Sequence, residues 1–209
     1  MNELKQAFIE VHNYWLAHYP MGQDKPRKDL QTGINLLMEL NNPIQPPART
    51  LPVINRYLPS AVEKITTPEF VPFTRLIQRI DSHLCWGVRP ASYIGETFTQ
   101  NYGFFPLAGP SYVDKILAFY PSQKVYAGVS ILAPHTLYPR HRHKAVEFYG
   151  VLSGSALLQQ GDGEWHRMES GSLVHNDSDV IHAIQTQDEP LMTTFIWIGD
   201  LVTPIDTDC

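Results

Sequence analysis

Four side chains that can bind a metal or a proton fall at odd positions in one short segment: His141, His143, Glu147 and Tyr149. In an extended strand, side chains alternate between the two faces, so we expect these four to project from one side of a sheet. Neutral imidazole and carboxylate are ligands for Zn, Fe, Mn, Co or Ni, whereas Mg and Ca prefer oxygen alone. The segment therefore predicts a strand that carries a transition-metal site.

The second half of the chain is typical of an antiparallel β-barrel or sandwich. From about residue 88, short alternating or β-branched runs are separated by Gly, Pro and Asp. Apolar residues alternate with others over 125–131, and Gly161-Asp162-Gly163 is a hairpin signal between segments 156–158 and 165–167. We expect further strands at 173–175, 183–186 and 193–198.

The first half is predicted to be helical. Apolar residues recur at three- and four-residue steps over 4–19, and similar patterns predict helices over 26–40 and 68–84. Residues 43–59 hold five prolines, so we expect this connector to wrap the surface without regular structure. The predicted architecture is a helical N-terminal extension, residues 1–87, packed on a barrel formed by residues 88–209.

Composition excludes several classes of partner. The 209 residues are 43% hydrophobic and 18% charged, which suits a globular protein with a substantial core. The formal charge of -5 comes without a basic stripe, so nucleic-acid binding is not expected. The N-terminus lacks the pattern of a signal peptide or membrane span, and Cys85 and Cys209 are too few for a disulfide framework. We expect a cytoplasmic protein with a small-molecule partner.

The spacing of the candidate ligands resembles a known two-part motif. His141-x-His143-x3-Glu147-x6-Gly154, followed by Gly171 and by His182 eleven residues later, is similar to the motif of the cupin superfamily, over about residues 120–200. The resemblance implies a mainly β fold, the double-stranded β-helix or jelly-roll barrel. It also implies that His141, His143, Glu147 and His182 hold one divalent metal, with Zn, Fe, Mn, Ni and Co all open. Four protein ligands leave a coordination position free, which suits catalysis.

Neighbouring motifs narrow the resemblance to the cupin-type dimethylsulfoniopropionate lyases. The motifs are Tyr138-Pro139, Leu152-Ser153-Gly154, Gly161-Asp162-Gly163-x-Trp165, Glu189-Pro190-Leu191 and Trp197. The resemblance implies a metal-dependent carbon-sulfur lyase that forms acrylate and dimethyl sulfide by α-proton abstraction and β-elimination. It makes Tyr149 the base, with its pKa lowered by the cation, and Tyr138 a substrate contact. Tyr102 and Trp197 could offer aromatic faces to a sulfonium.

Several alternatives stay open on the sequence. A related cupin lyase or isomerase acting on another small carboxylate, a non-catalytic ligand-binding cupin and an iron dioxygenase would use a similar ligand set. Tyr138, Tyr102 and Trp197 would also suit core packing, and His175 and His166 are either exposed or outer partners of the ligands. Arg140, Arg142 and Lys144 should point away from the metal, into solvent or an interface. A homodimer is compatible with the fold.

Overall fold

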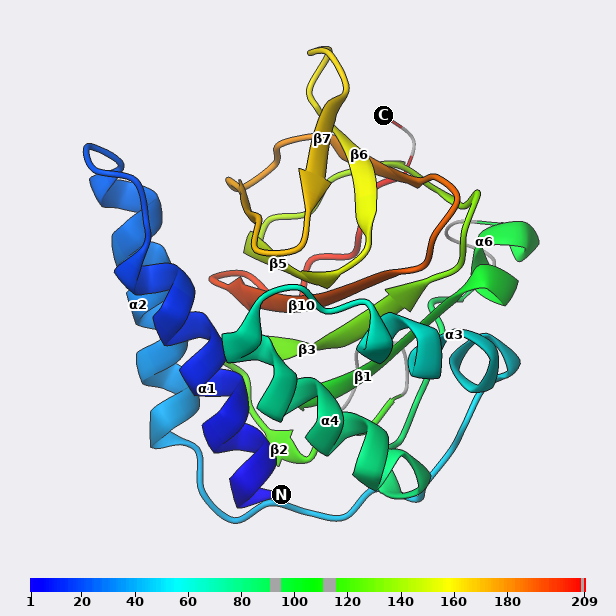
Figure 1. Cartoon of the computed structure of the whole chain (residues 1–209). Coiled ribbons are helices and arrows are strands. Elements are labelled where there is room, and N and C mark those ends of the chain that lie inside the picture. Colours follow the sequence, from blue (N-terminus) through cyan, green and yellow to red (C-terminus); the bar gives the residue numbers. More distant parts are fainter. Residues whose placement is uncertain (91–94, 111–115, 208) are drawn as a thin grey trace.

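The computed structural model describes residues 1–90, 95–110, 116–207 and 209. Five α-helices and two short 3-10 turns, η1 and η2, are assigned in these residues, together with ten strands (Figure 1). The helices and turns are α1 Asn2–Ala17, α2 Asp24–Glu39, α3 Pro52–Glu63, η1 Pro68–Phe70, α4 Val71–Ile80, η2 Asp81–His83 and α6 Glu96–Asn101. The strands are β1 Tyr102–Gly109, β2 Tyr120–Pro121, β3 Val125–Leu132, β4 Leu137–His141, β5 Val146–Ser153, β6 Ser155–Gln160, β7 His166–Glu169, β8 Leu173–Asn176, β9 His182–Thr186 and β10 Leu191–Ile198.

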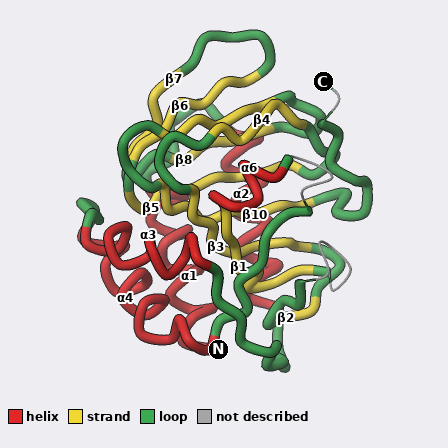
Figure 2. Tube along the Cα trace, turned by 90° about the vertical axis from the view of Figure 1, so that its right-hand side faces the viewer, coloured by secondary structure: helices red, strands yellow, loops and turns green. Residues whose placement is uncertain are grey.

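The strands form two sheets that face each other. One has six strands in the order β2-β1-β3-β10-β5-β8, and the other has four in the order β4-β9-β6-β7. Helices α1, α3 and α4 gather on the side of the larger sheet that is turned away from β4, β6 and β7 (Figure 2), and α2 packs against α1 and β10. The arrangement is the cupin double-stranded β-helix with an N-terminal helical extension, so the predicted fold class is confirmed.

The central strands β3 and β10 of the larger sheet are buried on both faces. On β10, Met192, Ile196 and Ile198 pack with the helices in one core cluster. The alternate residues Phe195 and Trp197 belong to a second cluster between the sheets. Period-two alternation therefore sends one set of side chains to the helices and the other into the barrel, where the candidate ligands lie.

The predicted connector over 43–59 is only half correct. Residues 40–48 have no regular structure, but α3 begins at Pro52 and runs through Pro59. Pro52 fits because the first turn of a helix does not need its missing N–H group. Burial of an apolar stripe, which includes Ile54 and Leu58, offsets the hydrogen bond lost at Pro59. The prediction of an irregular connector rested on the prolines and gave less weight to the helical spacing of the apolar residues.

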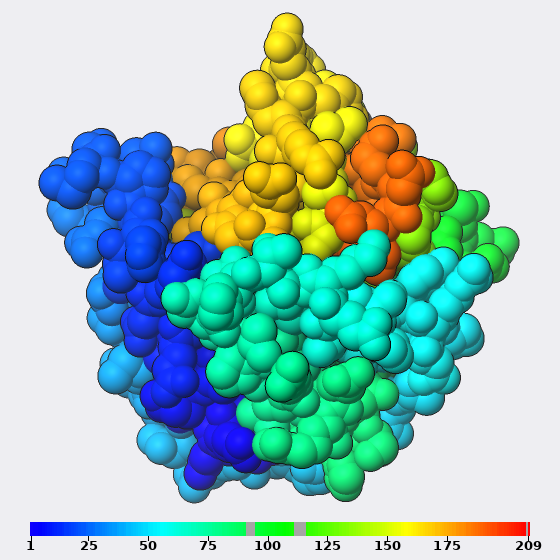
Figure 3. All heavy atoms as spheres, in the orientation of Figure 1, coloured from blue at the N-terminus to red at the C-terminus, as the bar shows by residue number. Residues whose placement is uncertain are grey.

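The predicted helices elsewhere in the first half are confirmed, with residues 68–84 forming η1, α4 and η2 in succession. One core cluster includes residues from both the helices and the barrel, so the helical extension packs directly on the barrel. The boundary between residues 87 and 88 stays a prediction. The β6–β7 hairpin and the tip between α1 and α2 project from the surface (Figure 3). None of the described helices has the length and apolar character needed to cross a bilayer.

Candidate metal centre

The segment 141–149 does not form one strand, in contrast to the prediction. His141 ends β4 in the smaller sheet, His143 lies in the turn that follows, and Glu147 and Tyr149 belong to β5 in the larger sheet. The chain crosses between the sheets at residues 142–145. The side chains still meet, because both strands direct them into the enclosed space between the sheets. They therefore converge inside the barrel and not, as predicted, on one face of a single strand.

Three buried imidazoles converge at this point. His141, His143 and His182 offer ring nitrogens that all lie within 4.8 Å of one another, and their side chains are nearly inaccessible to solvent. His182 comes from the start of β9, which pairs with β4 in a register that places it opposite His141. The structure therefore brings together three of the four predicted metal ligands as one cluster.

Hydrogen bonds fix which nitrogen of each ring faces the cluster. The Nδ1 atoms of His141, His143 and His182 donate to the carbonyls of Pro139, Ala145 and Val180 at 2.8, 2.9 and 2.8 Å. Because a carbonyl only accepts, Nδ1 carries a proton in each ring, and in the neutral imidazole Nε2 then keeps its lone pair. No described residue makes a hydrogen bond to any of the three Nε2 atoms. Three convergent, buried lone pairs fit a divalent metal ion, and backbone contacts of this kind orient metal-binding histidines.

Glu147 stands against two of these rings. Its Oε2 lies 3.1 Å from Nε2 of His182 and 3.4 Å from Nε2 of His143. Burial by itself would raise the pKa of this carboxyl, but the neighbouring side chains of His143 and His182 hold it well below its usual range. Burial lowers the pKa of His141 well below its ordinary value, and the charge of His182 adds to this effect. Metal binding requires a deprotonated carboxylate and neutral imidazole, and the lowered pKa values of Glu147 and His141 favour these forms.

Aromatic rings surround the cluster. Trp197 stacks on His143 with ring centroids 4.0 Å apart and donates its indole N–H to Glu147. Tyr138 stacks on His141 at 4.2 Å with the planes only 11° apart. A register shift between Tyr138 and His141 breaks the strand alternation and allows the two rings to share a side. Tyr102 is buried beside them, 5.8 Å from the ring of Tyr138.

Tyr149 is buried on the same inner face of β5 as Glu147. Burial raises the pKa of its phenol well above 10, and the charge of Glu147 and the phenols of Tyr138 and Tyr102 raise it further. Arg89 acts in the opposite direction and lowers the pKa. The sequence predicted a lowered pKa for Tyr149. Such a lowering requires a cation close to this phenol.

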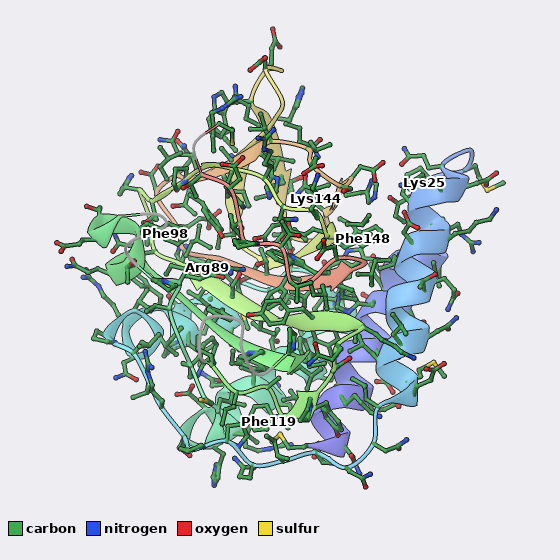
Figure 4. The ribbon with its side chains drawn as sticks, turned by 180° about the vertical axis from the view of Figure 1, so that it is seen from behind. Lys25, Arg89, Phe98, Phe119, Lys144 and Phe148 are labelled. Carbon is green, nitrogen blue, oxygen red and sulfur yellow. The ribbon has the colours of Figure 1, made fainter. Side chains whose placement is uncertain are left out.

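Arg89 is a component of the site that the sequence analysis missed. Its side chain is buried next to the larger sheet, with the guanidinium 5.2 Å from the ring of Trp197 and 5.5 Å from that of Phe104 (Figure 4). Such distances allow cation-π attraction, which helps a buried charge to remain inside a barrel. The residue follows Val88, where the helical texture ends, and no spacing rule links it to the ligand motif.

The remaining histidines and cations lie outside the cluster. His175 pairs across the strands with Phe148, whose ring lies 4.9 Å away, so His175 belongs to the outer face of the sheet. His166 is exposed on the β7 side of the hairpin. The three cations between the ligands point away, as predicted: Arg140, Arg142 and Lys144 form ion pairs with Asp162, Asp206 and Asp179. A hollow of about 260 Å³ opens next to His143, between the ion pairs of Arg142 with Asp206 and of Lys144 with Asp179.

Comparison with known proteins places this fold and cluster in a family. A sequence profile of the dimethylsulfoniopropionate lyases matches residues 26–193. The chain belongs to the dimethylsulfoniopropionate lyase family. Dimethylsulfoniopropionate lyase DddQ of Ruegeria pomeroyi is 30% identical over 112 residues, which are 54% of this chain and 53% of that protein. The alignment thus spans about half the length of this curated relative. Membership confirms the resemblance noted in the sequence and the assignment to a family of lyases.

Solved structures agree on the fold along the whole chain. A structure from a study of the lyases RdDddP and RnDddQII matches with a TM-score of 0.70 at 20% identity and covers 100% of this chain and 99% of its own. The crystal structure of DddQ from Ruegeria pomeroyi matches with a TM-score of 0.64 at 21% identity, covering 95% and 96%. The similarity includes the N-terminal helices as well as the barrel.

Proposed function

We propose that this chain is a metal-dependent lyase that cleaves dimethylsulfoniopropionate to acrylate and dimethyl sulfide. The observation that carries the proposal is the cluster of three buried imidazoles with unbonded Nε2 atoms, in a member of this lyase family. His141, His143 and His182 would hold one divalent transition metal, with Glu147 as the fourth ligand. The ion would supply a Lewis acid for the carboxylate of the substrate, and so acidify the neighbouring carbon.

Tyr149 is our candidate for the base. It lies on the inner face of β5, two residues after Glu147, and is buried among the phenols of Tyr102 and Tyr138. In the proposed reaction the phenolate oxygen takes the α-proton, the electrons of the broken C–H bond form the double bond, and the C–S bond breaks. The sulfur leaves with the electron pair of the C–S bond as neutral dimethyl sulfide, so no redox cofactor is required. Arg89 favours the phenolate through its charge.

Aromatic side chains define where the cationic end of the substrate would bind. Phe98 stacks on Tyr102 at 4.8 Å and lies 4.4 Å from Tyr138, which forms a patch of rings beside the histidines. We assign sulfonium recognition to this patch, through Tyr102 and Tyr138, because ring faces attract cations. Trp197 was also predicted to bind substrate, but its ring already contacts His143 and Arg89. We therefore propose that Trp197 positions Glu147.

The proposal is tested by an assay on protein stripped of metal and then reloaded separately with Zn, Fe, Mn, Co and Ni. We expect dimethyl sulfide and acrylate in equal amounts from dimethylsulfoniopropionate, and no product from the stripped protein. A panel of other small carboxylates separates this activity from a related lyase or isomerase, and oxygen uptake would reveal a dioxygenase. Turnover of another carboxylate, with no dimethyl sulfide at any metal loading, would overturn the proposed substrate.

A further inference from the structure

Two amide side chains form a chain of hydrogen bonds from the edge of the barrel to Glu147. Asn176, at the end of β8, is completely buried and donates from Nδ2 to Oε2 of Glu147 at 3.0 Å. Gln160, at the end of β6, is exposed as a residue, but its Nε2 reaches Oδ1 of Asn176 at 2.6 Å. The two residues belong to different sheets, so this chain of hydrogen bonds links the sheets next to the histidine cluster.

A backbone carbonyl determines the direction of every hydrogen bond in the chain. Nε2 of Gln160 also lies 2.8 Å from the carbonyl oxygen of His175. A carbonyl only accepts, so the group of Gln160 that faces it must be the NH2 group. That same NH2 group therefore meets the oxygen of Asn176, and the NH2 group of Asn176 is left to face Glu147. The orientation of a buried amide is thus set by a residue at the surface.

The result is a carboxylate held at both of its oxygens. Trp197 donates its N–H to Oε1, and an indole can act only as a donor. Asn176 donates to Oε2, the same oxygen that lies 3.1 Å from His182 and 3.4 Å from His143. With two donors on different atoms, the plane and the position of the carboxylate relative to the imidazoles are fixed.

We propose that Gln160 and Asn176 are positioning residues for Glu147, and that they hold its carboxylate in the geometry that binds the metal. This inference rests on the proposed function, since it requires a metal at the histidine cluster. Outer partners of this kind change metal affinity by about 10- to 100-fold when they are removed. Neither side chain makes a hydrogen bond to the imidazoles of the three histidines, and Asn176 bonds directly to Glu147, so we assign the effect to Glu147. Gln160 also pairs with His182 between β6 and β9, but through the backbone, which a change of the side chain leaves in place.

The sharpest test is Gln160→Glu, because the exposed position tolerates the change in the fold. Glutamate cannot donate to the His175 carbonyl, and it can only accept from Asn176. The amide of Asn176 must then turn its NH2 group toward residue 160 and its oxygen toward Glu147. Gln159→Glu is the matched control, since it makes the same change of charge on the same strand. The side chain of Gln159 bonds to Gly163 and Arg140 instead.

The measurement is a titration of the metal-free proteins with Co²⁺, followed by the visible absorption of the bound ion and by circular dichroism of the fold. We expect Gln160→Glu to bind Co²⁺ about tenfold more weakly and with a changed absorption spectrum, while Gln159→Glu behaves as the wild type. Asn176→Ala should lose affinity similarly. In the double variant Gln160→Glu with Asn176→Ala, the losses should not add, because both substitutions break one chain of bonds.

Affinity within twofold of wild type in Gln160→Glu, with an unchanged spectrum, would overturn the inference while leaving the metal site intact. An equal loss in Gln159→Glu would also overturn it, because the cause would then be charge alone. Failure of the wild-type protein to bind Co²⁺ is a separate result, which would reject the proposed metal centre and the positioning role together.

Discussion

His182 and Glu147 approach each other to 3.1 Å between Nε2 and Oε2, although β9 and β5 belong to different sheets. The proposed ligands therefore meet only when the barrel has closed. A metal that binds all of them stabilises the folded chain relative to the unfolded one, in which the ligands are dispersed. Metal binding and stability are consequently coupled in this account.

This coupling predicts the effect of metal on unfolding. At a free metal concentration about 100 times the dissociation constant, the free energy of unfolding should rise by about 2.7 kcal/mol. His182→Ala should abolish most of this gain, because it removes one of the three clustered imidazoles. The measurement is thermal unfolding with and without metal. His166→Ala, at an exposed position on β7, is the control that should keep the full gain.

Tyr149→Phe separates the chemistry from metal binding. The substitution removes only the phenolic oxygen, so the protein should keep its metal and its fold. Turnover should fall at least about 100-fold if this oxygen accepts the α-proton. Metal content and dimethyl sulfide release are measured on the same preparation. Activity close to wild type in Tyr149→Phe would eliminate the proposed base.

The sequence predicted which side chains of the site come together better than it predicted their local structure. Residue types and spacing grouped His141 and His143, and the resemblance to the cupin motif added His182, which the closed barrel brings to the same place. The same spacing suggested one strand, since alternation cannot distinguish a continuous strand from two strands joined by a turn. Arg89 and Gln160 were not anticipated, because their contacts depend on how distant segments pack.

The helices were also only partly predictable from the sequence. The apolar stripes of α1 and α2 were evident. The change to strands was predicted too early, at about residue 88, because α6 occupies Glu96–Asn101 and the first strand begins at Tyr102. The helix α3 was missed because its prolines suggested a loop, whereas a first-turn proline and a buried stripe stabilise the helix in the folded chain. In α3, burial against the rest of the protein outweighs the low helix propensity of proline. A sequence pattern alone does not show how much surface a segment will bury.

His12 gives the fold a dependence on pH that is independent of the metal. It is fully buried in α1, with Nδ1 bonded to the Phe8 carbonyl at 2.7 Å and Nε2 at 3.0 Å from Oγ1 of Thr194. Burial lowers the pKa of His12 from 6.5 to about 4. Between these two values the unfolded chain binds the proton more readily, so stability falls as the pH is lowered, by on the order of 3 kcal/mol in total.

Urea unfolding between pH 7 and pH 4.5 measures this loss. The variant His12→Gln should show a shallower fall in stability over that range than the wild type. His18→Gln is a matched control, because His18 is exposed and bonds in the same way to the carbonyl four residues before it. Equal pH dependence in His12→Gln and wild type would contradict the assignment.

Gly150 is required by the packing of α1 on the sheet. A Cβ at this position would lie 2.2 Å from the ring of Trp15 and 2.7 Å from Oγ1 of Thr194. Gly150→Ala should therefore lower the free energy of unfolding by about 1–3 kcal/mol. The smaller ring in Trp15→Phe should relieve part of the clash, so the double variant should lose less than the sum of the two single losses. Strict additivity would argue against this contact.

The central claim is that a metal at the histidine cluster is required for cleavage of dimethylsulfoniopropionate. It is tested most directly by titrating metal-free protein with a divalent transition metal while dimethyl sulfide release and bound metal are measured together. We predict activity that rises in proportion to bound metal and stops rising at one ion per chain, with none in a His141→Ala/His182→Ala double variant. Full activity in the metal-stripped protein, or saturation of the site without any dimethyl sulfide, would contradict the account.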